Sequence, residues 1–150
     1  MSVRVEPIGV LRTGFEERIP DGWETAVATI EVKEAWLPAL EGIEEFSHLI
    51  ILFWLHRIPR EGIQLKTHPQ GRQDLPAVGI FATRTPYRPN PIGLQMVELV
   101  SREGNVLTVR GIDAYDGSPV LDIKPYLSRG DCLGETRIPD WLMTLWEIEP

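Results

Sequence analysis

The part of the sequence best suited to binding an anion is a stretch that combines arginine with proline. Arg84 and Arg88 stand four residues apart, and prolines occupy positions 86, 89 and 91. Each proline fixes its own φ and lowers the entropy that is lost when the stretch becomes ordered. Two guanidinium groups held in this way match carboxylates and phosphates. The stretch therefore predicts an anion-binding site; the alternative is a structural turn whose arginines pair with the chain's own carboxylates.

Acidic residues at the end of a predicted strand form a second candidate site. Asp113 ends the strand, and Asp116 follows three residues later, directly before Gly117. Their carboxylates could accept hydrogen bonds from a ribose, a cationic amine or an exocyclic base amine. For Asp116 the sequence favours a plain turn in which the side chain bonds its own backbone. For Asp113 the binding and structural interpretations stay equally open.

The histidines and the cysteine give no pattern for a metal site. His48 and His56 would lie about 26 Å apart at the two ends of one strand, so they cannot share an ion. Of the two, His56 opens a basic segment and is the better functional candidate. The sequence has neither Cys-x-x-Cys nor His-x-x-x-His, and its single cysteine is Cys132. We expect no metal and no intrachain disulfide.

Three other enzyme signatures are missing from the sequence. It contains no Gly-x-Ser-x-Gly elbow, no Gly-x-Gly-x-x-Gly fingerprint and no phosphate-binding loop ending in Gly-Lys-Ser/Thr. These absences argue against a serine hydrolase, a dinucleotide-binding fold and a nucleoside-triphosphatase.

The charge of the chain is acidic overall but uneven. The net charge of −7 disfavours a general nucleic-acid binder, because the phosphate backbone would be repelled. Residues 57–88 hold six basic and two acidic side chains, so this window carries +4 and the remainder −11. A basic segment in an acidic body is suited to local anion binding, although a chance distribution over a solvated face would look the same.

The length and the spacing of turn residues predict one β-rich domain. A chain of 150 residues fits a single domain spanning 1–150. The N-terminus has no apolar signal core, and the longest apolar run, residues 49–55, is far shorter than the roughly twenty needed to cross a bilayer. We therefore expect a cytoplasmic protein without a membrane segment.

Short strands dominate the elements that the patterns predict. The expected strands are 3–12, 25–33, 48–56, 77–83, 94–101, 106–113 and 120–123, with a hairpin turn at Gly104-Asn105. The nearly continuous apolar run at 48–56 predicts a strand that is buried on both faces. A short helix is expected over 35–41, a helix or strand over 140–148, and a functional or mobile loop over 57–76. The fold class that follows is all-β or β-rich, a single small β-barrel with few short helices.

Three long strings make the chain similar to a known family. They are EFSHLIILFWLH at 45–56, GIFATR at 79–84 with RPNPIG at 88–93, and DGSPVLDIKPY at 116–126. Together they resemble the TrmO-like family of single-barrel, S-adenosylmethionine-dependent tRNA methyltransferases, which methylate N6 of threonylcarbamoyladenosine beside the anticodon. The resemblance runs from about Val5 to Tyr126, and the chain looks like the short, archaeal-type form.

The resemblance implies a small barrel, a homodimer, S-adenosyl-L-methionine as cofactor and the tRNA anticodon loop as partner. Carried over by position, the cofactor-binding residues would be His56, Arg57, Arg84, Leu94, Asp113, Ala114, Tyr115 and Asp116. The residues expected to bind the RNA substrate are Arg60, Lys66, Tyr87, Arg88 and Asn90. The first loop, Ile19–Trp23, departs from the family's Pro-Arg-Gln string, so no cofactor contact is assigned to it. Arg57 stands where relatives have glutamine, and no catalytic base is identified.

Two other function classes compete with this interpretation. A non-catalytic dimeric sensor that binds S-adenosylmethionine or a nucleotide would fit the acidic charge and the lack of an evident base. A plain RNA-binding barrel fits less well, because basic and aromatic positions are not spread over the sequence. Methyl transfer, donor binding without transfer, and RNA retention without donor binding would separate the three.

Overall fold

The computed structural model describes residues 1–148 and divides the chain into two compact units. The first unit comprises residues Met1–Ile58 and Pro91–Tyr126. The second comprises Pro59–Asn90 and the chain from Leu127 onward.

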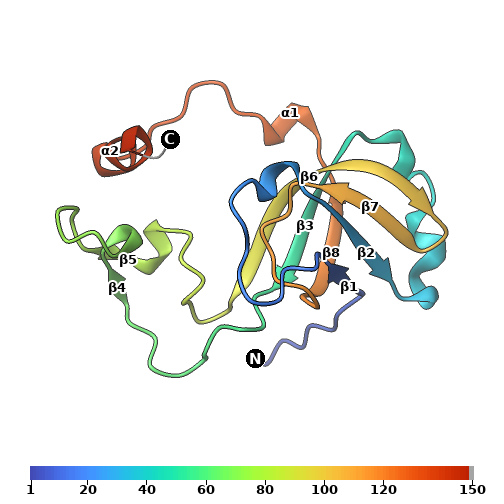
Figure 1. Cartoon of the computed structure of the whole chain (residues 1–150), viewed down its shortest axis with the longest axis horizontal. Coiled ribbons are helices and arrows are strands. Elements are labelled where there is room, and N and C mark those ends of the chain that lie inside the picture. The colour runs from blue at the N-terminus through green and yellow to red at the C-terminus, as the bar shows by residue number, and fades with distance from the viewer. Residues whose placement is uncertain (149–150) are drawn as a thin grey trace. The chain divides into compact units, whose positions relative to one another are not determined.

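The first unit is a closed barrel of six antiparallel strands in the order β1-β2-β7-β6-β3-β8 (Figure 1). The strands are β1 (Gly9–Arg12), β2 (Val27–Val32), β3 (His48–Trp54), β6 (Ile92–Glu103), β7 (Val106–Arg110) and β8 (Pro119–Pro125). β6 and β7 are joined by the predicted turn at Gly104-Asn105. The predicted small β-barrel is thus confirmed, with a closed sheet that leaves no free strand edge.

The core consists of the side chains that point into the barrel from one face of each strand. In β3, Leu49, Ile51 and Phe53 are buried, while the residues between them are partly exposed. β2 and β7 alternate in the same way. The prediction that residues 48–56 are buried on both faces is wrong, because in a barrel every second side chain points outward.

A glycine on β6 makes room for the largest ring in the core. Gly93 pairs with Phe53 across β3 and β6, and a Cβ built on Gly93 would lie 2.6 Å from the Phe53 ring. The ring is only 2% exposed, so it has no free volume into which it could move. Gly93 therefore belongs to the packing of the barrel.

We expect Gly93→Ala to destabilise the barrel by about 1–3 kcal/mol, because the added methyl overpacks the site at Phe53. Chemical denaturation at equilibrium measures this loss. Gly79→Ala is the matched control, since a Cβ on Gly79 meets nothing within 4 Å and its φ is not positive. Equal stability of the two variants would show that the Phe53 contact does not constrain position 93.

Predicted and observed element boundaries differ at the N-terminus and in the first helix. The strand predicted over 3–12 is present only as β1, because Pro7 interrupts the pairing with β2 and β8. The helix predicted over 35–41 is a 3-10 helix, Glu34–Leu40, that contains Pro38.

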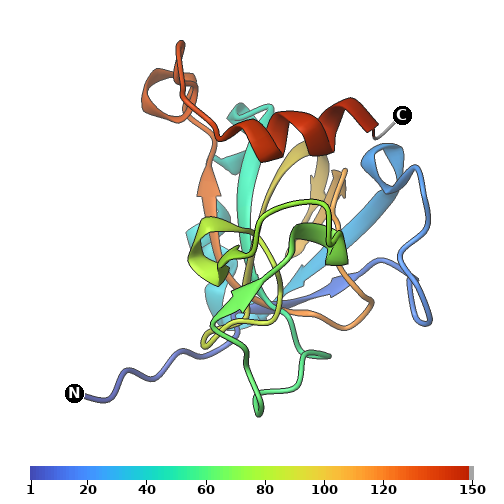
Figure 2. The ribbon, with the colours of Figure 1, turned by 90° about the vertical axis from the view of Figure 1, so that its left-hand side faces the viewer.

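The second unit contains two short strands, β4 (Lys66–Thr67) and β5 (Val78–Gly79), and the helices α1 (Ser128–Asp131) and α2 (Asp140–Ile148), the latter the long red helix of Figure 2. The strand predicted over 77–83 is wrong beyond Gly79. A 3-10 turn, Ile80–Ala82, follows, and Thr83 closes it by donating both its backbone N–H and its hydroxyl to the Ile80 carbonyl. The terminal element predicted as helix or strand is the helix α2. None of the helices within residues 1–148 has the length and apolar character needed to cross a membrane.

Candidate functional site

The connection from β7 to β8 carries outward-facing polar side chains at one end of the barrel. Gly111 follows β7 with a φ of 86°, and its N–H donates to the Ala26 carbonyl at 3.1 Å. A Cβ there would lie 3.0 Å from the Glu24 carbonyl oxygen, so glycine fits this position. Ile112 and Ala114 are buried in the core, and the alternation turns Asp113 and Tyr115 outward.

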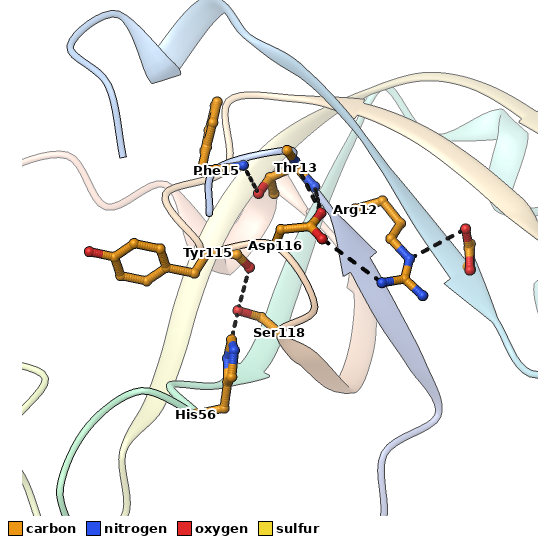
Figure 3. Close-up of polar contacts among 9 residues, drawn as sticks. Arg12, Thr13, Phe15, His56, Tyr115, Asp116 and Ser118 are labelled. Atoms are coloured by element: carbon orange, nitrogen blue, oxygen red, sulfur yellow. Dashed lines mark hydrogen bonds and ion pairs between the residues drawn. The ribbon is translucent and has the colours of Figure 1, made fainter. Parts of the chain in front are cut away.

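Asp116 ties the loop after β1 to this connection. Its Oδ1 accepts the backbone N–H of Thr13 at 2.8 Å and that of Gly14 at 3.0 Å, and Arg12 lies 3.9 Å from Oδ2 (Figure 3). The backbone N–H of Asp116 in turn donates to the Phe15 carbonyl at 3.0 Å. The two backbone donors, Gly14 first, hold the pKa of Asp116 below its ordinary value of 3.8.

His56 and Arg57, which follow β3, contact the same connection. The Nδ1 of His56 lies 3.3 Å from the hydroxyl of Ser118 (Figure 3). The guanidinium of Arg57 stacks on the Tyr115 ring at 4.3 Å and donates to the carbonyl of Glu16. Partial burial first, and the Arg57 charge second, lower the pKa of His56 from its ordinary 6.5. The imidazole is therefore neutral at pH 7.

These contacts join three chain segments into one group, which we call the barrel-end cluster. It comprises Arg12–Glu16, His56–Arg57 and Asp113–Ser118. On the β7–β8 connection, the Asp113 carboxylate faces outward without a hydrogen bond or ion pair within residues 1–148. Partial burial of its carboxyl and, second, the Glu24 carboxylate raise the pKa of Asp113. A carboxylate whose ionisation is unfavourable in the free protein is suited to a cationic or hydrogen-bond-donating ligand, which would stabilise its charge.

We expect Asp113→Asn to stabilise the protein at pH 7. Because the pKa of Asp113 is raised in the folded chain, ionisation costs more there than in the unfolded chain, and the cost is felt above the ordinary value of 3.8. The stability gain should shrink as the pH falls through the folded pKa and vanish below 3.8. Thermal unfolding of both proteins across this range measures it. Glu103→Gln, an exposed neutralisation elsewhere on the barrel, is the control and should show no such trend.

Three of the eight predicted cofactor residues, all in the first unit, offer no free side chain at the barrel-end cluster. The Ala114 side chain is 2% exposed and belongs to the core, so only its backbone is available to a ligand. Asp116 uses its carboxylate to hold the Thr13–Glu16 loop. Leu94 lies on β6, half-exposed on the outer barrel wall opposite Leu52. His56 and Arg57 contact the connection through Ser118 and Tyr115, and Asp113 stands two residues before Tyr115 on the same connection.

The predicted arginine–proline stretch lies in the second unit as far as Asn90, and this part is held by its own hydrogen bonds. Arg88 donates through Nη1 to the carbonyls of Thr83 and Thr85, at 3.5 and 3.3 Å. Arg84 is exposed and forms no hydrogen bond or ion pair within residues 1–148. Arg88 thus stiffens the loop that presents Arg84. Asn90, Arg60 and Lys66 are exposed as well.

Tyr87 lines a cavity of about 260 Å³ that lies wholly within the second unit. The other lining residues are mostly small or polar: Pro59, Glu61, Gly62, Ile63, Gln64, Thr67, Ile80 and Thr85. The cavity combines an aromatic ring with hydrogen-bonding groups, a combination that suits a planar polar ligand.

The sequence did not identify two parts of the cluster. The Thr13–Glu16 loop is held by Asp116, about a hundred positions away in the chain, which no local pattern reveals. Ser118 stood within the DGSPVLDIKPY string but was not singled out. Within residues 1–148, no group of three His, Cys, Asp or Glu side chains is arranged to hold a metal ion.

Comparison with known proteins places this geometry in a family. The model of the tRNA-methyltransferase O N-terminal domain (TrmO_N) matches residues 16–132. A probable S-adenosyl-L-methionine-binding protein of Methanothermobacter thermautotrophicus is 42% identical over 138 residues, which cover 89% of this chain and 97% of that protein. The tRNA (adenine(37)-N6)-methyltransferase of Mus musculus is 36% identical over 135 residues, which are 84% of this chain but 31% of the mouse protein.

Solved structures agree with the sequence comparison. TrmO from P. aeruginosa has a TM-score of 0.74 and 37% identity, over 93% of this chain and 62% of that one. The chain therefore spans less than two thirds of the TrmO chain it resembles. The predicted family is confirmed: with most of its length matched by the family model and a TrmO-like barrel, this chain belongs to the family of the tRNA-methyltransferase O N-terminal domain.

Proposed function

We propose that this chain is an S-adenosyl-L-methionine-dependent tRNA methyltransferase that acts on N6 of threonylcarbamoyladenosine beside the anticodon. The observation that carries the proposal is the barrel-end cluster of a member of this family, in which one connection carries an outward carboxylate and an aromatic ring and contacts a neutral imidazole. Relatives named as S-adenosylmethionine-binding proteins and as a tRNA adenine methyltransferase support the reaction class.

The cluster contains the groups that the cofactor requires. S-adenosylmethionine has a cationic sulfonium, an ammonium, ribose hydroxyls and an adenine, and when bound it supplies an electrophilic methyl group. Asp113 can accept hydrogen bonds from the ribose or the ammonium, and its negative charge favours a cation. The Tyr115 ring offers a stacking surface, and Arg57 fixes its orientation. Arg84 is proposed to pair with a carboxylate of the donor.

The second unit is proposed to bind the RNA. Arg60 and Lys66 would contact phosphates, while Arg88 and Asn90 hold and flank the loop that carries Tyr87. Tyr87 is 56% exposed at the edge of the 260 Å³ cavity, where an unstacked purine could lie on its ring. Arg57, Arg60 and Lys66 also belong to the basic window of an otherwise acidic chain.

Methyl transfer is an in-line displacement, so the residues of this chain contribute mainly by orienting the two reactants. The acceptor nitrogen is a poor nucleophile because its lone pair is delocalised into the purine and the carbamoyl group. Its N–H is correspondingly acidic, and a late proton transfer to water would suffice. We assign no side chain as the base.

The test incubates the protein with a methyl-labelled donor and tRNA and identifies the modified nucleoside after digestion. Label only in threonylcarbamoyladenosine supports the proposal. tRNA lacking the threonylcarbamoyl group is the control that separates this substrate from unmodified adenosine. Donor binding without transfer would instead indicate a sensor, and RNA retention without donor binding would indicate an RNA-binding barrel.

We expect Arg60→Glu with Lys66→Glu to raise KM for tRNA about tenfold or more while leaving donor affinity unchanged. Each reversal replaces an attraction to phosphate by a repulsion. Steady-state kinetics with tRNA and calorimetry with the donor separate the two effects. Arg4→Glu with Arg18→Glu changes the net charge by the same amount at exposed positions of the first unit and serves as control. If both pairs of reversals act alike, residues 60 and 66 form no specific RNA surface.

We propose that residues 1–150 form one methyltransferase domain that works as a homodimer in the cytoplasm. Sedimentation equilibrium with and without S-adenosylhomocysteine measures the oligomeric state, and a monomer at micromolar concentration under both conditions would contradict the dimer.

A further inference from the structure

Ser118 is a buried polar residue whose hydroxyl contacts two groups of the barrel-end cluster. Ser118 is only 2% exposed and stands at the end of the connection, directly before β8. The hydroxyl oxygen lies 2.7 Å from the carbonyl oxygen of Tyr115 and 3.3 Å from Nδ1 of His56 (Figure 3). These two contacts decide which nitrogen of His56 carries the proton.

The carbonyl of Tyr115 can only accept a hydrogen bond, so the single hydroxyl proton of Ser118 is donated to it. The hydroxyl oxygen then faces His56 with a lone pair and accepts from Nδ1. Nδ1 therefore carries the ring proton. Because the imidazole is neutral, Nε2 is left with a lone pair.

The charges around His56 support the neutral ring. Arg57 follows it directly, and both burial and this cation lower its pKa. Two carboxylates stand on the facing connection: Asp116, whose Oδ1 is occupied by the N–H groups of Thr13 and Gly14, and Asp113, which forms no hydrogen bond or ion pair within residues 1–148. No carboxylate within residues 1–148 is paired with His56, so nothing there favours the imidazolium.

We propose that Ser118 is a positioning residue that holds His56 as the Nδ1–H tautomer, so that Nε2 accepts a hydrogen bond from an N–H or O–H of a bound nucleoside. The identity of the ligand rests on the proposed function, whereas the tautomer does not. Both the methyl donor and the target adenosine carry such groups: an exocyclic N–H and ribose hydroxyls. In the opposite tautomer Nε2 would be a donor, which an exocyclic N–H cannot accept and only a ribose hydroxyl, turned to accept, could match.

The tautomer is measured by nitrogen-15 NMR of the histidine rings in the ligand-free wild-type protein. We expect a protonated Nδ1 and an unprotonated Nε2 for His56. Ser118→Ala should shift the ring toward the Nε2–H form, and Ser118→Thr, which keeps the hydroxyl, should restore the wild-type pattern. Ser47→Ala is the matched control: it removes a hydroxyl 2.8 Å from Nδ1 of His48 and should leave His56 unchanged.

Binding then tests the role of the acceptor. Ser118→Ala should weaken S-adenosylhomocysteine about five- to tenfold, the effect of one lost hydrogen bond. In a His56→Ala background the same substitution should have no further effect. The Nε2 resonance should shift on adding S-adenosylhomocysteine if the donor is the partner, or on adding tRNA alone if the target nucleoside is.

Each outcome decides one part of the proposal. An Nε2–H tautomer in the wild-type protein overturns it, and this measurement requires no variant to fold. A Ser118→Ala variant that keeps the Nδ1–H form removes Ser118 from the positioning role. A third outcome is a protein that shows the expected tautomer but binds neither S-adenosylhomocysteine nor tRNA. This result would overturn the proposal of a nucleoside ligand and the proposed function, whereas the assignment of the ring proton would stand.

Discussion

Replacing Asp116 by alanine is expected to lower the free energy of unfolding by about 1.5–3 kcal/mol, the contribution of hydrogen bonds to a charged acceptor. The carboxylate receives the N–H groups of Thr13 and Gly14 and lies near Arg12. Without it, two backbone donors of the loop lose their partner. For a chain of this size the loss corresponds to a fall in Tm of roughly 3–12 °C.

The loss of Asp116 should also release the Thr13–Glu16 loop from the barrel. Glu16 is the residue to which Arg57 donates, and Arg57 stacks on Tyr115, so we expect weaker S-adenosylhomocysteine binding as well. Amide hydrogen exchange at residues 13–16 reports the release directly. Asp21→Ala is the control, because it removes the same charge from a fully exposed side chain farther along the connection from β1 to β2.

The pH dependence of this effect has a definite sign. The pKa of Asp116 is lowered in the folded chain, so its stabilising contribution is present above the ordinary value of 3.8 and is lost as the pH falls through the folded pKa. The stability difference between wild type and Asp116→Ala should shrink under acid accordingly. An unchanged loop in Asp116→Ala at pH 7 would mean that the two backbone contacts do not hold it.

Replacing Arg84 by alanine is expected to weaken donor binding or turnover by about 1.5–3 kcal/mol, roughly 10- to 150-fold. Arg84 is exposed and without a partner within residues 1–148, while Arg88 holds its loop through two carbonyls. Because the loop backbone is already held, only the side chain of Arg84 has to become ordered when it binds an anion. Little loss of stability should accompany the change.

Two further variants make this prediction specific. Arg84→Lys keeps the charge but loses the planar fork, so its effect should lie between wild type and alanine. Arg129→Ala removes an exposed arginine of the same unit and should leave kinetics unchanged. Wild-type kinetics in Arg84→Ala would remove this residue from the site.

The sequence predicts correctly those strands that have one apolar face and are bounded by a recognisable turn. The alternation of residues 25–33 and 106–113 matches β2 and β7, and Gly104-Asn105 is the observed turn. The strand over 77–83 is wrong because strand formation needs a partner. β5 pairs with β4 over two residues only, and the apolar run then turns.

The candidate site was predictable where local position determines a residue's role. His56 lies two residues after β3 and Asp113 three residues after β7, close to strand ends, where outward polar side chains are expected. For Asp116 the favoured structural interpretation is correct in kind, but its partners are Thr13 and Gly14 rather than its own turn. Such long-range partners depend on the closure of the barrel, and local sequence contains no sign of it.

The most direct test of the account is a crystal structure of the protein with S-adenosylhomocysteine. We predict that the ligand lies against the barrel-end cluster, with a ribose or ammonium group on the Asp113 carboxylate, an N–H or O–H within hydrogen-bond distance of Nε2 of His56, and its adenine near the Tyr115 ring. A ligand bound in full occupancy without contact to any of these three residues would contradict the account.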